Sequence, residues 1–308
     1  MPSALYTRIR NAARARNTLA NQDAAGGASA PRAIGVPAIA GATHVGVVRR
    51  VNQDAFGRFD DPERGEILLT VADGLGGHRG GEVASRMAID LVGPLVASGA
   101  EPAHLRLVRA IEEANRQIHE EARVDYTLEG MGTTLVCLLL ARSGECHVAH
   151  VGDSRLYRLR DDQLEPLTED HSLVATLVRE GVLRPEEART DPRRNQILRA
   201  LGVRKEVEID VAPVETRPGD VLLLCSDGLH GLIEDFEIRD LTLEHPEVEV
   251  AVERLIEAAN RAGGTDNVTC MLARFPDPPP SPPVPPWRAS AQRMVAMVRA
   301  WLPARRPS

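Results

Sequence analysis

Short apolar runs rich in β-branched residues recur along residues 41–275, and they come in groups between helical patterns. Alternating or continuous apolar residues predict strands over 67–72, 134–140, 146–151, 155–160, 221–225 and 268–272. Apolar residues at helical spacing predict helices over 83–95, 105–122 and 248–259. A βαβ repeat would place a helix after each strand. The order found here instead favours an α+β fold of largely antiparallel sheets covered by helices.

Both ends of the chain differ in composition from this central region. Residues 1–40 are rich in Ala, Arg, Gly and Ser with little periodicity, which predicts a disordered tail. Eight of the eleven residues in 276–286 are proline, which predicts a stiff, extended linker. The pattern over 287–303 predicts a basic amphipathic helix, followed by a short tail to residue 308. Such a helix is suited to docking on a membrane surface, on a protein partner or on its own domain. The sequence leaves all three alternatives open.

Charge and cysteine content narrow the function classes. The net charge of −7 is concentrated in 41–275, because both tails are rich in Arg and poor in acids. So acidic a region argues against binding to nucleic acid. The four cysteines form no CxxC pair and are typical of reduced core cysteines. No apolar run is long enough to span a membrane. We therefore expect a cytoplasmic protein, with peripheral membrane association only through residues 287–303.

Five aspartates in turn-like contexts carry the chemical signal. They are Asp54 in RRVNQDAF, Asp73 in VADGLGGH, Asp153 in HVGDSR, Asp227 in LLLCSDGL and Asp266 in GGTDNV. One Asp-Gly pair alone is usually only a turn. Several carboxylates that converge would repel one another unless a hard cation neutralised them. Because the ligands would all be oxygens, Mg²⁺ or Mn²⁺ fits better than Zn²⁺.

Seven segments in this order resemble the metal-dependent (type-2C) protein serine/threonine phosphatases in their bacterial form. They are GVVRRVNQDAF, VADGLGGHRGGEVAS, GMGTTLV, HVGDSRLYRL, EDHS, SDGLHGLI and GGTDNVT. The resemblance covers about residues 41–275 and leaves both tails outside. It implies a catalytic domain built as an α/β/β/α sandwich, in which two mainly antiparallel sheets are flanked by helices.

The resemblance also implies a set of metal ligands. Asp73 would bridge two Mn²⁺ or Mg²⁺ ions, and Asp227 and Asp266 would complete the first site. The backbone carbonyl of Gly74 and the side chain of Asp54, partly through water, would serve the second. A water between two such cations loses a proton near neutral pH and can attack phosphorus directly, without a phosphoenzyme.

Three further positions follow from the same resemblance. Arg49 would hold the substrate phosphate, since a guanidinium matches two phosphate oxygens at once. Asp153 matches a position that helps to bind a third, weaker metal in bacterial relatives. His78 is a candidate general acid, although eukaryotic relatives carry a histidine two residues after Asp73, where this chain has Leu75. Hydrogen bonding within the Gly-rich loop is the alternative role for His78.

These residues predict hydrolysis of phosphoserine and phosphothreonine in proteins, including a cognate bacterial kinase. The alternative is a catalytically inactive relative that acts as a phosphoprotein-binding regulatory module. An inactive relative is expected to have lost metal ligands. Asp54, Asp73, Asp227 and Asp266 are all present, which favours the enzyme.

Overall fold

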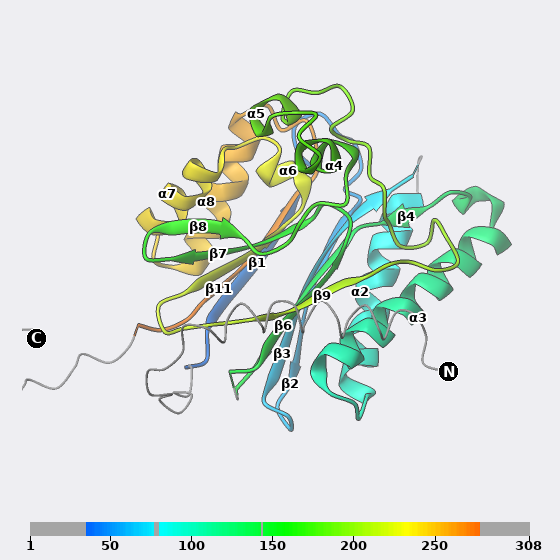
Figure 1. Ribbon diagram of the computed structural model, residues 1–308. Helices are drawn as coiled ribbons and strands as arrows, with labels where there is room; N and C mark the ends of the chain where they lie inside the picture. Colours follow the sequence, from blue (N-terminus) through cyan, green and yellow to red (C-terminus); the bar gives the residue numbers. More distant parts are fainter. Residues whose placement is uncertain (1–34, 77–79, 143, 278–308) are drawn as a thin grey trace, which may run out of the picture.

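The computed structural model describes residues 35–76, 80–142 and 144–277 (Figure 1). Its elements in chain order are β1 (Ala38–His44), β2 (Asp54–Asp61), β3 (Glu66–Leu75), α2 (Gly80–Ser98), α3 (Ala103–Val124), the 3-10 helix η1 (Tyr126–Leu128), β4 (Gly132–Thr133), β5 (Leu135–Ala141), β6 (Cys146–Val151), β7 (Arg155–Arg160), β8 (Gln163–Pro166), α4 (Leu173–Arg179), α5 (Pro185–Ala188), β9 (Asp210–Val214), β10 (Val221–Cys225), α6 (Asp227–His230), α7 (Asp235–Glu244), α8 (Val248–Arg261) and β11 (Val268–Arg274).

The strands form two antiparallel sheets that pack face to face. Sheet A has the order β1-β11-β10-β7-β8, and sheet B has the order β2-β3-β5-β6-β9, with β4 paired to β3. Figure 1 shows α7 and α8 on the outer side of sheet A, and α2 and α3 on the outer side of sheet B. The predicted α/β/β/α sandwich is therefore confirmed.

Strand β5 shows why the central strands read as continuous apolar runs. Val136, Leu138 and Leu140 point into the core between the two sheets. Leu135 and Leu139 alternate with them and pack beneath α2 and α3. A strand covered on both faces has no solvent side on which to place polar residues. The same condition accounts for the apolar runs of β10 and β11 in sheet A.

The helices lie on the sheets through apolar stripes and close contacts. In α8, Val248, Val252, Leu255 and Ile256 are buried at the spacing of one helix face. In α2, Gly93 lies directly over Phe59, and a Cβ at residue 93 would come within 2.4 Å of the Phe59 ring. Helix α2 can therefore approach sheet B closely at this point.

Some sequence-based expectations differ from the structure or lie outside it. Strand β1 begins at Ala38, inside the range 1–40 that was expected to be a disordered tail, because it pairs along its length with β11. Strand β2 begins at Asp54 and was not predicted, since only part of its surface is buried. Residues 1–34, most of the linker 276–286 and the predicted helix 287–303 lie outside the described residues. All four cysteines are free and buried on strands, as expected.

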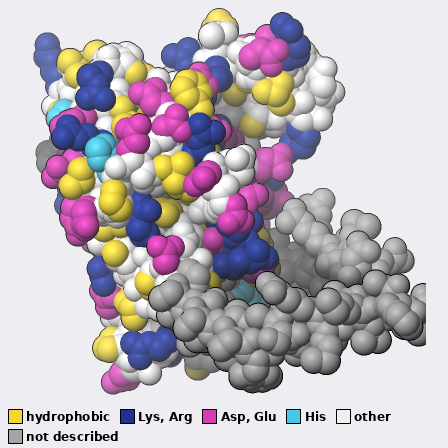
Figure 2. Space-filling model, turned by 90° about the vertical axis from the view of Figure 1, so that its left-hand side faces the viewer, with side chains coloured by type: hydrophobic (Ala, Val, Ile, Leu, Met, Phe, Trp, Pro, Cys, Tyr) yellow, Lys and Arg dark blue, Asp and Glu magenta, His cyan; other side chains and the backbone are white. Residues whose placement is uncertain are grey.

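The helices and the surface bear on whether the protein spans a membrane or binds nucleic acid. No helix within the described ranges has both the length and the apolar character needed to span a membrane. Figure 2 shows the face that carries α7 and α8, where basic and acidic side chains are interspersed. The described part of that face carries no continuous basic stripe of the kind that nucleic-acid binding requires.

Candidate metal centre

Asp54 and Asp73 lie opposite each other on neighbouring strands. The antiparallel register of β2 and β3 pairs the two residues directly. Directly opposed residues in such a pair project their side chains to the same face of the sheet, about 5 Å apart. The carboxylates therefore sit side by side at one edge of sheet B. Two like charges this close are unfavourable unless a proton or a cation neutralises them.

Asp54 is held from the other sheet. Its Oδ2 accepts hydrogen bonds from Ser226 Oγ at 2.8 Å and from Thr269 Oγ1 at 2.7 Å. Ser226 follows β10 and Thr269 lies in β11, so both donors belong to the sheet A side of the sandwich. Their backbones are also joined, because the Ser226 N–H donates to the Thr269 carbonyl at 3.0 Å. These contacts fix one oxygen of Asp54 and leave the other directed elsewhere.

Asp73 is fixed through its backbone by the GMGTTLV motif. Its N–H donates to Thr134 Oγ1 at 2.9 Å, and its carbonyl accepts from the Thr134 N–H at 2.8 Å. Thr133 Oγ1 also donates to that carbonyl, at 2.9 Å. The two threonines thus position the strand end on which Asp73 stands. The sequence indicated this motif only by resemblance, and the structure gives its physical role.

Asp227 and Asp266 come from sheet A. Asp227 begins α6 immediately after β10, and Asp266 lies in the loop between α8 and β11. Gly228 permits the turn, because a Cβ at residue 228 would lie 1.8 Å from the Asn267 carbonyl oxygen. Burial raises the pKa of Asp227, and the charge of Asp266 raises it further. The two carboxylates therefore lie close enough to repel each other.

Asp153 enters the cluster from the turn after β6. Gly152 has φ +106°, a backbone conformation that side-chain-bearing residues rarely adopt, and it turns the chain so that Asp153 is buried. Burial raises the pKa of Asp153, and the nearby charge of Asp227 adds to the effect. For Asp73, burial is again the largest cause of a raised pKa, followed by the charges of Asp54, Asp227 and Asp153. The predicted aspartates therefore converge.

Three buried carboxylate oxygens of the aspartate cluster have no hydrogen-bond partner within the described part of the chain. They are Asp54 Oδ1, Asp153 Oδ1 and Asp227 Oδ1. A buried acceptor without a partner is costly, and a buried carboxylate without a counter-charge is more so. Burial raises the pKa of Asp54 to about 7, against an ordinary value of 3.8. Unpaired carboxylate oxygens that lie close together are the donor set that a hard divalent cation prefers, so these residues fit Mn²⁺ or Mg²⁺.

Gly74 occupies a position where no side chain could fit. A Cβ at residue 74 would come within 2.1 Å of the Gly81 carbonyl oxygen at the start of α2. The Gly74 N–H donates to the Gln53 carbonyl at 3.1 Å. Glycine is therefore required for α2 to pack against the end of β3. The role of the Gly74 carbonyl as a metal ligand stays a prediction.

Arg49 lies at the rim of the carboxylate cluster. Its Nη2 donates to Asp266 Oδ2 at 2.8 Å, while about half of its side chain (49%) is exposed to solvent. A half-exposed guanidinium beside the cluster is available to an incoming anion. His78, the candidate general acid, belongs to residues 77–79, which lie outside the described ranges.

A cleft of about 450 Å³ adjoins the cluster, and the sequence did not predict its shape. Asp153, Asp227 and Asp266 are among its lining residues. Val174 and Val178 of α4 line it as well. Both valines belong to segment 171–201, which carries α4 and α5 and therefore borders the cleft. The cleft gives a protein segment a path to the carboxylates.

Comparison with known proteins finds similar sequences and folds among serine/threonine phosphatases. A family model described as Protein phosphatase 2C matches residues 40–274. The serine/threonine phosphatase Stp of Listeria welshimeri is 41% identical over 235 residues, which are 75% of this chain and 92% of that protein. The crystal structure of the serine/threonine phosphatase PstP/Ppp of Mycobacterium tuberculosis has a TM-score of 0.71 at 40% identity, covering 78% of this chain and 99% of that one.

A further solved structure bears on the metal question. It is the catalytic domain of the serine/threonine protein phosphatase PstP in complex with two manganese ions. Its TM-score is 0.70 at 39% identity, and the match covers 79% of this chain and 99% of that one. The family match spans both sheets and all five aspartates of the cluster.

Proposed function

The chain belongs to the protein phosphatase 2C family, and from that membership and the carboxylate cluster we infer that it is a metal-dependent serine/threonine protein phosphatase. The observation that carries the inference is that three buried carboxylate oxygens of the aspartate cluster lack a partner among the described residues. An inactive relative that only binds phosphoproteins would not need to retain such a costly arrangement.

Two cations are proposed to bind between the sheets. Asp73, Asp227 and Asp266 would hold one ion, and Asp54 and the Gly74 carbonyl would hold the other beside Asp73. Mn²⁺ or Mg²⁺ suits this oxygen-only donor set, and the manganese complex of PstP supports Mn²⁺. When bound, such a pair activates water for attack on phosphorus and neutralises the phosphate oxygens. Asp153 would contribute to a third, weaker ion.

The chain's own residues supply positioning around this centre. Ser226 and Thr269 hold Asp54 so that only one of its oxygens remains available. Arg49 would swing from Asp266 to the substrate phosphate, where its guanidinium can pair with two oxygens. The cysteines are excluded as nucleophiles, because they are buried and burial raises, for example, the pKa of Cys270 to about 12.

Partners and location remain proposals. We expect phosphoproteins carrying phosphoserine or phosphothreonine as substrates, a cognate kinase among them. We also propose a cytoplasmic location, with residues 287–303 as the segment that docks on a membrane surface or on another protein. That segment lies outside the described residues, and the proposal rests on its basic, amphipathic sequence.

The function is tested by removing the bridging carboxylate. Asp73→Asn should abolish Mn²⁺-dependent hydrolysis of p-nitrophenyl phosphate and of a phosphothreonine peptide. Asp60→Asn, at an exposed position on β2, is the matched control and should retain wild-type rates. Substantial turnover by Asp73→Asn, at unchanged Mn²⁺ dependence, would contradict the assignment.

A further inference from the structure

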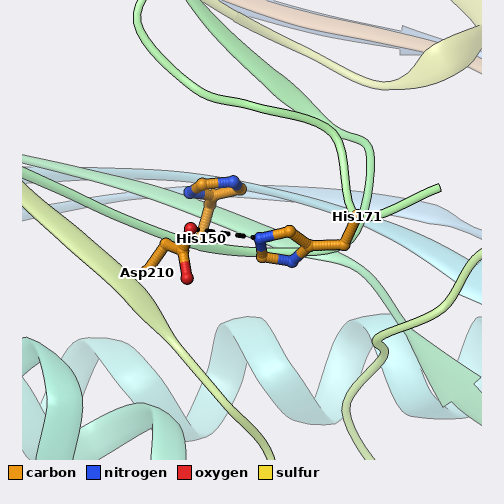
Figure 3. Close-up of side chains that lie close together, drawn as sticks. All are labelled: His150, His171 and Asp210. Carbon is orange, nitrogen blue, oxygen red and sulfur yellow. Dashed lines mark ion pairs between the residues drawn. The ribbon is translucent and has the colours of Figure 1, made fainter. Parts of the chain in front are cut away.

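A second cluster of titratable side chains lies next to the turn that carries Asp153. His150 of β6, His171 and Asp210 of β9 meet there, and Figure 3 shows the two imidazole rings stacked with Asp210 beside them. The ring centroids are 4.6 Å apart and the ring planes are inclined by 22°. Both histidines are buried, whereas about half of the Asp210 side chain (49%) is exposed.

Contacts to both ring nitrogens hold the His171 imidazole in place. The Gly152 N–H donates to His171 Nδ1 at 3.1 Å, so Nδ1 acts as an acceptor. Nε2 lies 3.4 Å from Asp210 Oδ2 and 3.1 Å from Arg199 Nη1. In return, the backbone N–H of His171 donates to the Gly152 carbonyl at 2.9 Å. His171 and Gly152 are therefore joined in both directions.

This arrangement excludes a cation shared by the three residues. Nδ1 of His171 is already used by Gly152, and the Arg199 guanidinium lies 3.1 Å from Nε2. Lone pairs of imidazole lie in the ring plane, and two nearly parallel stacked rings do not aim them at one point. Arg199 Nη1 also lies 3.0 Å from Asp210 Oδ1, which supplies the positive charge at this place. The cluster is thus a hydrogen-bonded support rather than a metal site.

The support acts on the turn at 152–154, which is held at three successive residues. Gly152 is bonded to His171. The Asp153 carbonyl accepts from His230 Nε2 at 3.0 Å, and His230 ends the helix that Asp227 begins. Ser154 Oγ is bonded to Thr134 Oγ1 at 2.7 Å. Because the buried Asp153 Oδ1 has no partner among the described residues, these backbone contacts set where the carboxylate points.

His171 also closes the base of the segment that covers the cleft, residues 171–201. The Leu198 N–H donates to the His171 carbonyl at 2.7 Å, and the Leu173 N–H donates to the Gln196 carbonyl at 2.8 Å. The outgoing and returning ends of the segment thus meet at His171. The segment is therefore joined to Gly152 at His171, through the imidazole ring and through the backbone N–H.

We propose that His171 is a positioning residue that couples segment 171–201 to Asp153 and orients that carboxylate for the third, weaker cation. The proposal rests on the proposed function, because it concerns the weaker ion of the same centre. It assigns the effect to one bond, between the Gly152 N–H and His171 Nδ1. His171 itself does not touch the substrate or the stronger ions.

Two substitutions test the contacts of the two ring nitrogens of His171 one at a time. In His171→Asn the side-chain oxygen can take the place of Nδ1 and accept from Gly152, but the contact with Asp210 is lost. In His171→Gln the amide nitrogen can take the place of Nε2 beside Asp210, but the acceptor for Gly152 is lost. Both variants are tested in the full chain by Mn²⁺ titration, with free Mn²⁺ followed by electron paramagnetic resonance, and by measurement of kcat and KM.

The expected result is a split between the variants. His171→Gln should weaken only the lowest-affinity Mn²⁺ by about tenfold, as loss of a residue that orients a ligand does, while the tighter ions remain. His171→Asn should bind all ions as the wild type does. Asp153→Asn is the reference for complete loss of the weaker ion. Circular dichroism of each variant confirms that it is folded.

Three outcomes would overturn the proposal. One is wild-type affinity for the weaker ion in His171→Gln, and another is a wild type without a weaker Mn²⁺. The third is a folded His171→Asn protein that loses this ion as completely as Asp153→Asn does. This third outcome can be measured even if His171→Gln does not fold. Failure of the proposed function looks different, because the wild-type protein would then lack Mn²⁺-dependent phosphatase activity altogether.

Discussion

The carboxylate cluster should make the metal-free protein less stable as the pH rises. Burial raises the pKa of Asp54 from 3.8 to about 7 in the folded protein. Between these values the folded state holds a proton that the unfolded state has released, so the free energy of unfolding falls with increasing pH. At about 1.4 kcal/mol for each pKa unit, Asp54 alone contributes a loss of roughly 4 kcal/mol between pH 4 and pH 7. The raised pKa values of Asp73, Asp153 and Asp227 act in the same direction.

The variant Asp54→Asn tests this reasoning, because it should stabilise the protein in the absence of metal. The amide oxygen of residue 54 can still accept from Ser226 and Thr269. Its amide group would replace the unpaired Oδ1 and donate to a neighbouring carboxylate. We therefore expect metal-free Asp54→Asn to be more stable than the wild type at pH 8, and its stability to depend less on pH.

Urea unfolding followed by circular dichroism, with EDTA at pH 5, 6.5 and 8, measures both effects. Asp220→Asn is the control, and its effect on the free energy of unfolding should have the opposite sign. Asp220 is also buried, but it accepts from Arg160 Nε at 2.8 Å and Nη2 at 2.7 Å, so its loss should destabilise the protein. Added Mn²⁺ should reverse the order of wild type and Asp54→Asn. A metal-free Asp54→Asn protein that is less stable than the wild type at pH 8, with the same pH slope, would refute the account.

Two further substitutions probe the surroundings of the cluster. Thr269→Val keeps the shape of the side chain but removes a donor to Asp54. It should weaken Mn²⁺ binding by about tenfold, since a hydrogen bond to a charged group contributes about 1.5–3 kcal/mol. Wild-type affinity in a calorimetric titration would contradict the role of this contact. Arg49→Ala should chiefly raise KM for a phosphothreonine peptide, whereas exposed Arg50→Ala should leave KM unchanged; equal effects of the two changes would remove Arg49 from the phosphate site.

Much of the architecture follows from local patterns. The apolar run of β5 and the helical stripe of α8 are strong signals, because burial on both faces of a strand and on one face of a helix leaves a regular imprint on the sequence. Strands β1 and β2 carry no such imprint, since they lie at sheet edges and are only partly buried. Their place is decided by pairing with β11 and β3, which are already formed by stronger patterns.

The sequence by itself determined which residues carry the chemistry: five aspartates in turn motifs, and an order of motifs that resembles one enzyme family. Only the tertiary structure decided how they act together. Asp54 meets Ser226 and Thr269 across separations of 172 and 215 residues, and Gly152 donates its N–H to His171 Nδ1. Such contacts depend on strand register and on the packing of one sheet against the other. Strand register and sheet packing cannot be inferred from a local sequence pattern, because such a pattern indicates only whether its own residues are buried.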